Sequence, residues 1–235
     1  MRSDRLGLVS YLFDCSDEYG RSRGLVQAAG AVEDEQLVVV PTESVYGVGC
    51  DAFARAAVRE IHRLKGHRTP PPVLVPHGRT LDGLATGVPP AARALAEAFW
   101  PGPLTLVCRA QPTLDWDLGN AQGTVSVRMP LHPVALELLE RTGPLALTTA
   151  NRPGEPAPTT CEEAQDQLGE AVEVYLDAGP ALRQGLSTVV DARGEVPRLV
   201  RAGAVPLAEL REVAPDLVAP GEEATSADAG SEVSR

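Results

Sequence analysis

The sequence predicts one α/β domain with three layers around a twisted, mixed β-sheet, and three observations support this. Short β-branched runs alternate with segments of helical apolar spacing from about residue 20 to 212, without a linker or a change of composition. The later strands follow one another with short turns, which favours a mixed sheet over an all-parallel one. Of the 235 residues, 43% are hydrophobic and 4% aromatic, so the core is expected to consist of Val, Leu and Ala.

The first part of the chain alternates between helix and strand. Residues 24–36 are expected to form a helix whose buried face comprises Val26, Ala29 and Val32. Residues 37–41 are expected to form a buried strand, because the run is short, apolar and β-branched. The following Gly-Val-Gly is interpreted as a turn. The next helix begins at Ala54 and ends before Gly66, a residue typical of helix ends, and its apolar positions are Ala57, Val58, Ile61 and Leu64.

Prolines bound the elements in the middle of the chain. Residues 69–76 form a rigid extended entry into a further strand, and a helix over residues 90–100 is stopped by Pro101. Two apolar runs, residues 104–108 and 124–128, are expected to be strands.

The C-terminal part is richer in strands than in helices. A helix over residues 132–141 precedes a strand over 145–148. Thr160 and the acids after it indicate the start of a helix over residues 160–168. The last expected strands cover residues 172–176, 187–191 and 198–200.

Composition and charge exclude several classes of protein. The net charge of −11 argues against nucleic-acid binding through the whole surface. No apolar run is long enough to span a membrane and no signal peptide is recognisable, so a cytoplasmic protein is expected. Residues 1–19 are interpreted as an N-terminal extension and 213–235 as an acidic tail. The tail is expected to be disordered, above all after about Val218, where it lacks apolar periodicity.

The four cysteines are far apart in the sequence, and the four histidines are equally scattered. A structural zinc site needs ligands in close pairs, so no metal site is expected and the cysteines are interpreted as buried, reduced thiols.

Polar residues gather beside five expected strand ends or turns. The clusters are Thr42 to Tyr46, Lys65 with His67 and Arg68, Thr124 to Arg128, Thr148 to Asn151, and Ser187 and Thr188 with Arg201. Each cluster alone has an ordinary explanation: Thr42 suits a turn, Lys65 complements a helix dipole and Asn151 forms turns. Arg128 differs, because an arginine within a core strand needs an anionic partner.

Together these clusters contain cations, hydroxyls and one amide, but no nucleophile with a base, no carboxylate pair and no metal-ligand cluster. Such groups suit the binding of phosphates and carboxylates, with chemistry that comes from positioning and charge neutralisation, as in phosphoryl or nucleotidyl transfer. The phosphate-binding motif G-x-x-x-x-G-K-[ST] is absent, and VYGVGCDAF fits the dinucleotide motif poorly.

An ordered set of motifs resembles a known family. It comprises PTESVYGVGCDAF, Lys65 at the following helix end, FWPGPLTLV, TVSVRMPLHP, TTANRPGEPAPT, LSTVVD and VRAGAV. These motifs resemble the YrdC/Sua5 family of L-threonylcarbamoyladenylate synthases over about residues 20–212. The chain is too short to resemble members with an additional C-terminal Sua5 domain.

The resemblance implies a twisted mixed sheet with a concave, positively charged face that holds the reactants. It also implies synthesis of threonylcarbamoyl-AMP and pyrophosphate from L-threonine, bicarbonate and ATP, with Mg²⁺. The product would feed N6-threonylcarbamoylation of adenosine 37 in tRNA, with tRNA-modification proteins as partners.

The same resemblance assigns roles to individual residues. L-threonine would be bound by Thr42, Arg128 and Ser187. ATP would be bound by Lys65, His67, Arg68, Thr124, Thr149, Asn151 and Arg201. The catalytic residues would be Lys65, Arg128 and Arg201.

Three positions depart from the family pattern. The usual Lys-x-Arg is Lys65-Gly66-His67-Arg68, so either His67 or Arg68 takes the place of the arginine. Thr149 replaces the serine of Ser-x-Asn, and Val75 stands where many members have histidine. Two alternatives therefore remain: a divergent relative that acts on another carbamoyl acceptor, and a non-catalytic module that binds double-stranded RNA.

Overall fold

The computed structural model describes residues 10–181 and 185–222, in which ten strands form one mixed sheet. The order across the sheet is β1-β8-β2-β3-β7-β4-β6-β5-β9-β10. Four neighbouring pairs are parallel (β1 with β8, β2 with β8, β4 with β6, β5 with β9), and the other pairs of the described sheet are antiparallel. The predicted mixed sheet is therefore confirmed. The strands are β1 Tyr11–Asp14, β2 Val38–Val40, β3 Gly47–Asp51, β4 Val73–Leu74, β5 Leu104–Arg109, β6 Thr124–Arg128, β7 Leu145–Thr149, β8 Val174–Asp177, β9 Thr188–Asp191 and β10 Arg198–Arg201.

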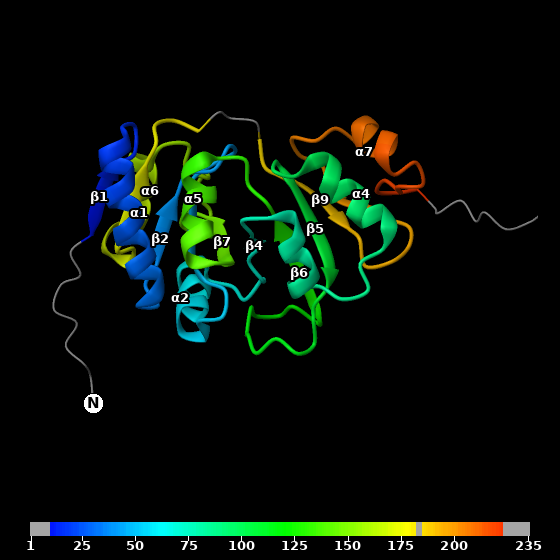
Figure 1. The fold of residues 1–235 in the computed structure, drawn as a ribbon, viewed down its shortest axis with the longest axis horizontal. Helices are drawn as coiled ribbons and strands as arrows, with labels where there is room; N and C mark the ends of the chain where they lie inside the picture. Colours follow the sequence, from blue (N-terminus) through cyan, green and yellow to red (C-terminus); the bar gives the residue numbers. More distant parts are fainter. Residues whose placement is uncertain (1–9, 182–184, 223–235) are drawn as a thin grey trace, which may run out of the picture.

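Helices cover the two faces of this sheet unequally, which confirms the three predicted layers (Figure 1). The α-helices are α1 Glu18–Glu33, α2 Arg55–Lys65, α3 Leu81–Leu84, α4 Pro90–Phe99, α5 Pro133–Thr142, α6 Cys161–Leu168 and α7 Leu207–Val213. On one face α1 and α5 lie side by side and pack on β2, β7 and β8. On the other face α2, α4, α6 and α7 pack on the larger core. No described helix is both long and apolar enough to cross a membrane.

The buried face of α1 differs from the predicted one. The helix starts at the cap Asp17, whose side chain accepts a hydrogen bond from the Gly20 amide (2.8 Å). Its core residues are Leu25, Ala28, Ala31 and Val32. Val26 is instead 55% exposed, because the larger Leu25 lies against the sheet and turns its neighbour outward.

β3 corrects the interpretation of Gly-Val-Gly as a turn. Gly47 and Gly49 lie within a strand that pairs with β2 and β7. A Cβ at Gly47 would lie 2.1 Å from Leu147 Cδ2. The glycines are therefore required by the close packing of Leu147 over β3 and not by a turn conformation.

Both ends of the domain extend beyond the predicted limits of 20 and 212. β1 lies within the predicted N-terminal extension and pairs with β8. At the other end Ala214, Leu217 and Val218 are buried, and the Val218 amide donates to the Pro197 carbonyl (3.0 Å). These apolar residues are too few to form a periodic pattern, so their packing was not predictable from apolar spacing. The rest of the predicted tail, 223–235, lies outside the described residues.

The four cysteines are free and buried, as expected. Burial is the main cause that raises the pKa of each thiol, to about 11 for Cys15 and about 12 for Cys108 and Cys161.

Candidate active site

An uncovered part of the sheet provides the floor of the site. Strands β6, β5, β9 and β10 are covered by helices on one face only, because α1 and α5 pack on the other half of the sheet. On the uncovered face the strand register places Arg128, Thr105, Val189 and Arg201 in one row. Inward apolar residues alternate with these along each strand, as expected for a sheet with one solvated face.

A cavity of about 240 Å³ lies against this row and is lined by Arg128, Thr105 and Arg201 of it. We call it the central cavity. Its polar lining consists of Thr42, Ser44, Thr105, Arg128, Thr148, Thr149, Ser187 and Arg201, and its apolar lining includes Val45, Leu74 and Leu147. Five of the predicted site residues, distant in the sequence, therefore meet in one place: Thr42, Arg128, Thr149, Ser187 and Arg201.

Arg128 is held by a buried ion pair with Glu43. Its Nη2 donates to Glu43 Oε1 and also to Ser44 Oγ (3.3 Å), and its Nε donates to the Gly102 carbonyl (3.2 Å). Glu43 Oε2 accepts from the Leu131 amide (3.2 Å). Glu43 is thus the anionic partner that was expected for an arginine within a core strand. Of the three guanidinium nitrogens, only Nη1 has no acceptor among the described residues.

Glu43 is a site residue that the sequence analysis did not assign. It lies in the first polar cluster, between Thr42 and Ser44, and is 2% exposed. Two features of the sequence could have identified Glu43: it directly follows a buried strand, and an arginine on another strand needed an anionic partner.

Lys65, at the end of α2, is 7% exposed and donates to Thr149 and Asn151. Its Nζ lies 3.0 Å from the Thr149 carbonyl, 3.3 Å from Thr149 Oγ1, 2.8 Å from the Asn151 carbonyl and 2.7 Å from Asn151 Oδ1. Gly66 after it has φ +67°, which ends the helix as predicted. Burial lowers the pKa of Lys65 below its ordinary value. The ammonium therefore lies directly behind Thr149, at the border of the central cavity.

Arg201 and Ser187 form the opposite wall. Arg201 Nε and Nη2 donate to the Ser187 carbonyl (3.1 and 2.8 Å), and Nη2 also contacts Ser187 Oγ (3.0 Å). Ser187 Oγ in turn bonds Thr105 Oγ1 (3.0 Å). Burial, and then the charge of Arg128, lower the pKa of Arg201. The two guanidinium groups are close enough for the charge of Arg128 to act on Arg201, so together they create a positive potential suited to an anion.

Hydrogen bonds from the hydroxyl groups of Thr42 and Tyr46 fix the conformation of the loop between β2 and β3. Thr42 Oγ1 donates to the Val45 carbonyl (2.6 Å) and accepts from the Ser44 and Val45 amides (both 3.2 Å). The hydroxyl of the fully buried Tyr46 donates to the Gly179 carbonyl (2.6 Å). Thr42 is therefore both a turn residue and part of the cavity wall, whereas Tyr46 anchors the loop to the end of β8.

Five predicted ATP-binding residues do not line the central cavity: Lys65, Asn151, His67, Arg68 and Thr124. Lys65 and Asn151 are bonded to each other behind Thr149. The His67 ring accepts from the Thr69 amide (3.2 Å), and Arg68 pairs with Asp117 (3.3 Å). Thr124 lies at the opposite end of β6 from Arg128, about 13 Å away by the rise of a strand, and donates to the Ala121 carbonyl (2.6 Å).

Within the described residues no group of three His, Cys, Asp or Glu side chains is arranged to hold a metal ion. The carboxylate of Glu43, beside the central cavity, is already bound to Arg128. The cavity thus offers arginine and hydroxyl donors together with a nearby ammonium, a combination that binds carboxylates and phosphates.

Comparisons with known proteins agree with this chemistry. The family model Sua5_yciO_yrdC, described as telomere recombination, matches residues 30–203. A Mycobacterium tuberculosis protein provisionally named threonylcarbamoyl-AMP synthase is 51% identical over 203 residues, covering 86% of this chain and 94% of that one. The threonylcarbamoyl-AMP synthase of Pyrococcus abyssi is 36% identical over 189 residues, covering 79% of this chain and 56% of that one.

Two solved structures have the same fold. Sua5 of P. abyssi, complexed with L-threonine, superposes with a TM-score of 0.81 at 32% identity, covering 89% of this chain and 62% of that one. Escherichia coli YciO superposes with a TM-score of 0.76 at 26% identity, covering 86% of this chain and 100% of that one. The chain thus spans nearly the whole mycobacterial relative but little more than half of the archaeal one.

Proposed function

The chain belongs to the Sua5/YrdC family, and on this premise we propose that it is an L-threonylcarbamoyladenylate synthase. Threonine and bicarbonate combine to a carbamate with loss of water, and a carbamate oxygen then attacks the α-phosphorus of ATP. The products are threonylcarbamoyl-AMP and pyrophosphate. Its curated relatives carry the name of this activity.

The observation that carries the proposal is the convergence of Arg128 and Arg201 on a cavity bordered by Lys65. The reaction has two anionic substrates and a developing charge on the leaving group, and it needs no protein nucleophile. Positioned cations in a cavity that holds little water are the means by which such a reaction is accelerated.

L-threonine is proposed to occupy the part of the cavity between Thr42, Arg128 and Ser187. Arg128 has Nε and Nη2 engaged, so it offers Nη1 to the threonine carboxylate as a single donor. A two-pronged contact would require the Glu43 pair to open. The size of the cavity, about 240 Å³, suits a small amino acid with the reacting end of a nucleotide.

The phosphates of ATP are proposed to lie toward Lys65, Thr149, Asn151 and Arg201. Lys65 and Arg201 would stabilise the negative charge that develops as pyrophosphate leaves. His67 and Arg68 lie in the loop that follows Lys65 and would contact phosphate from outside the cavity. Thr124 would meet a part of the nucleotide that extends along β6.

Mg²⁺ is proposed to arrive bound to ATP, because magnesium is commonly held by substrate phosphates and water. The described side chains do not form a cage for the ion by themselves. No step of the proposed mechanism is assigned to it.

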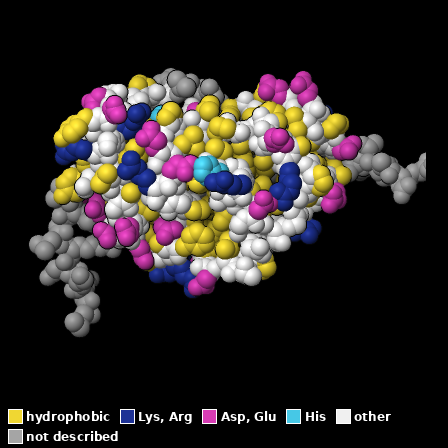
Figure 2. Space-filling model, viewed as in Figure 1, with side chains coloured by type: hydrophobic (Ala, Val, Ile, Leu, Met, Phe, Trp, Pro, Cys, Tyr) yellow, Lys and Arg dark blue, Asp and Glu magenta, His cyan; other side chains and the backbone are white. Residues whose placement is uncertain are grey.

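The adenylate is proposed to serve N6-threonylcarbamoylation of adenosine 37 in tRNA, with other tRNA-modification proteins as partners. The face shown in Figure 2 intersperses Lys and Arg with Asp and Glu, which disfavours the alternative of an RNA-binding module.

The test is an incubation with ATP, L-threonine and labelled bicarbonate. Labelled adenylate and pyrophosphate should appear together and depend on threonine. Arg201→Gln should lose about 10² in rate, as removal of one positioned donor commonly does. Arg59→Gln, the matched control on the exposed side of α2, should behave as wild type. Absence of both products from wild-type protein would overturn the proposal, and another acceptor in place of threonine would favour the divergent relative.

A further inference from the structure

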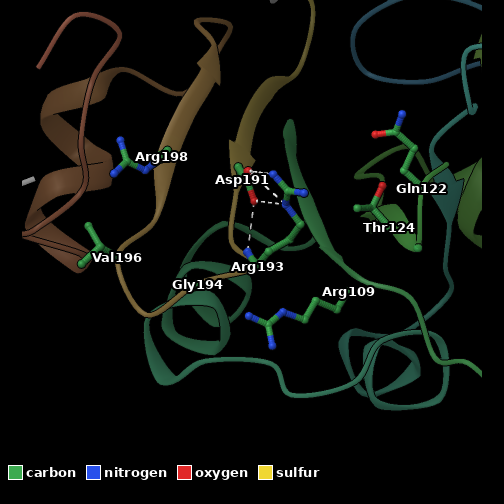
Figure 3. Close-up of a pocket in the computed structure, with 9 residues that line it drawn as sticks. Arg109, Gln122, Thr124, Asp191, Arg193, Gly194, Val196 and Arg198 are labelled. Atoms are coloured by element: carbon green, nitrogen blue, oxygen red, sulfur yellow. Dashed lines mark hydrogen bonds and ion pairs between the residues drawn. The ribbon is translucent and has the colours of Figure 1, made fainter. Parts of the chain in front are cut away.

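A second cavity, of about 390 Å³, lies at the other end of the uncovered strands. We call it the distal arginine cavity, and it is lined by Arg109, Gln122, Gly123, Thr124, Asp191, Arg193, Gly194, Val196 and Arg198 (Figure 3). Its lining comes from the end of β5, the start of β6 with the loop before it, the end of β9, the β9–β10 loop and the start of β10. The central cavity is formed by the opposite ends of these strands, about 13 Å away along β6.

The charge of the distal arginine cavity is not balanced. Asp191 is bound by Arg193, with Nε 2.9 and 3.1 Å from the two carboxylate oxygens and Nη2 2.6 Å from Oδ2. Three arginines against one aspartate leave an excess of two positive charges. This excess is local, since the chain as a whole has a net charge of −11.

Arg109 and Arg198 are the two cations in excess. Neither guanidinium makes a hydrogen bond or a close ion pair with a described residue, and both residues are exposed. Figure 3 shows them on different sides of the Asp191–Arg193 pair. Arg193 lowers the pKa of Asp191 by hydrogen bonding, and Arg198 adds to this by its charge. Asp191 therefore stays ionised and occupied by Arg193, which leaves the other two arginines available to a ligand.

From this arrangement we propose that the distal arginine cavity binds the phosphate group of a small molecule. Arginine offers planar, paired donors that match phosphate oxygens, and the recess presents two such guanidinium groups that form no hydrogen bond with a described side chain. The phosphate belongs either to the substrate nucleotide, reaching along β6 past Thr124, or to a separate small ligand. The binding itself does not depend on the proposed reaction.

The test uses inorganic pyrophosphate as the probe and an arginine-modifying dicarbonyl as the reporter on wild-type protein. Pyrophosphate should slow modification of Arg109 and Arg198, read by mass spectrometry, without slowing that of Arg23 and Arg59, which are exposed on α1 and α2. Equal modification of Arg109 and Arg198 with and without pyrophosphate overturns the proposal. So does protection of this pair by duplex RNA but not by pyrophosphate.

Variants then identify the source of the phosphate. Arg109→Gln/Arg198→Gln should bind pyrophosphate at this cavity at least about tenfold more weakly, because two charge-assisted contacts are lost. Arg23→Gln/Arg59→Gln removes the same charge elsewhere and should bind as wild type. A KM for ATP that rises with the first pair of substitutions assigns the phosphate to the substrate nucleotide. An unchanged KM, with weaker pyrophosphate binding, assigns it to a separate ligand, and unweakened pyrophosphate binding contradicts the proposal.

Discussion

Arg128 and Glu43 depend on each other for stability, while only Arg128 offers a donor to a substrate. Arg128→Met leaves the carboxylate of Glu43 buried without its cation, so the free energy of unfolding should fall by about 3–5 kcal/mol. Glu43→Gln/Arg128→Met removes the lone charge and should recover most of that loss. Both variants should lose at least about 10² in the rate of threonine-dependent pyrophosphate release.

Urea unfolding and the pyrophosphate assay separate the two effects. If Arg128→Met is as stable as wild type, the ion pair is not desolvated in the folded protein. A double variant with wild-type turnover would show that Arg128 does not contact the substrate.

Lys65 provides a prediction for the pH dependence of the reaction. Burial lowers its pKa below the ordinary value of 10.5, so its proton is lost at a lower pH than from an exposed lysine. Since the proposed role requires the ammonium, kcat/KM for ATP should fall as pH rises through this lowered pKa. Lys65→Arg keeps its charge to higher pH, so its profile should lack this alkaline decrease although its rate is lower. An identical alkaline decrease in wild type and Lys65→Arg would assign it to another group.

At the scale of single residues, the sequence predicted several of the residues that line the central cavity but not the hydrogen bonds that they make. Thr42, Arg128, Thr149, Ser187 and Arg201 line one cavity. The engagement of Arg128 by Glu43 depends on two loops and a strand that meet only in the folded chain. Sequence spacing carries no information on such long-range contacts, and the same holds for the separation of Thr124 from the central cavity.

Among the elements, α2 and β6 were predictable and β3 was not. In α2 the apolar spacing and Gly66 agree with each other and with the structure. In β3 the glycines suggested a turn. Local propensity contains no information on the neighbouring strand, where Leu147 occupies the space that a side chain at Gly47 or Gly49 would fill. β1, with Tyr11 and Leu12 about half exposed, lacks the buried face that produces a strand pattern.

Two glycines test this account of β3. Gly47→Ala places a methyl 2.1 Å from Leu147 Cδ2 and 3.1 Å from the Thr148 carbonyl, so unfolding free energy should fall by about 1–3 kcal/mol. Gly30→Ala, within α1, meets no atom within 4 Å and should stabilise by about 0.5–1 kcal/mol. Urea unfolding of both variants measures the contrast, and a Gly47→Ala protein as stable as Gly30→Ala would show that β3 and β7 are not packed this closely.

For the whole molecule, the unequal covering of the sheet explains where ligands are able to bind. The helices α1 and α5 cover one half of a face, and the remaining half carries a cavity at either end of β5, β6 and β9. Each cavity contains arginines although the chain is acidic overall. The long-range field thus repels polyanions in general, while local positive charge retains a small anion that fits.

The C-terminal limit of the domain gives a final prediction. Leu217 is 1% and Val218 5% exposed, and the Leu199 amide donates to the Val218 carbonyl (2.8 Å), so residues 214–222 complete the packing against β10. A chain that ends at Val213 should therefore unfold at lower urea than one that ends at Glu222, with each lost apolar side chain contributing up to about 1.5–3 kcal/mol. The full-length chain serves as the reference. Equal midpoints for the two shortened chains would mean that the fold is complete at Val213 and that the acidic tail begins where composition alone had suggested.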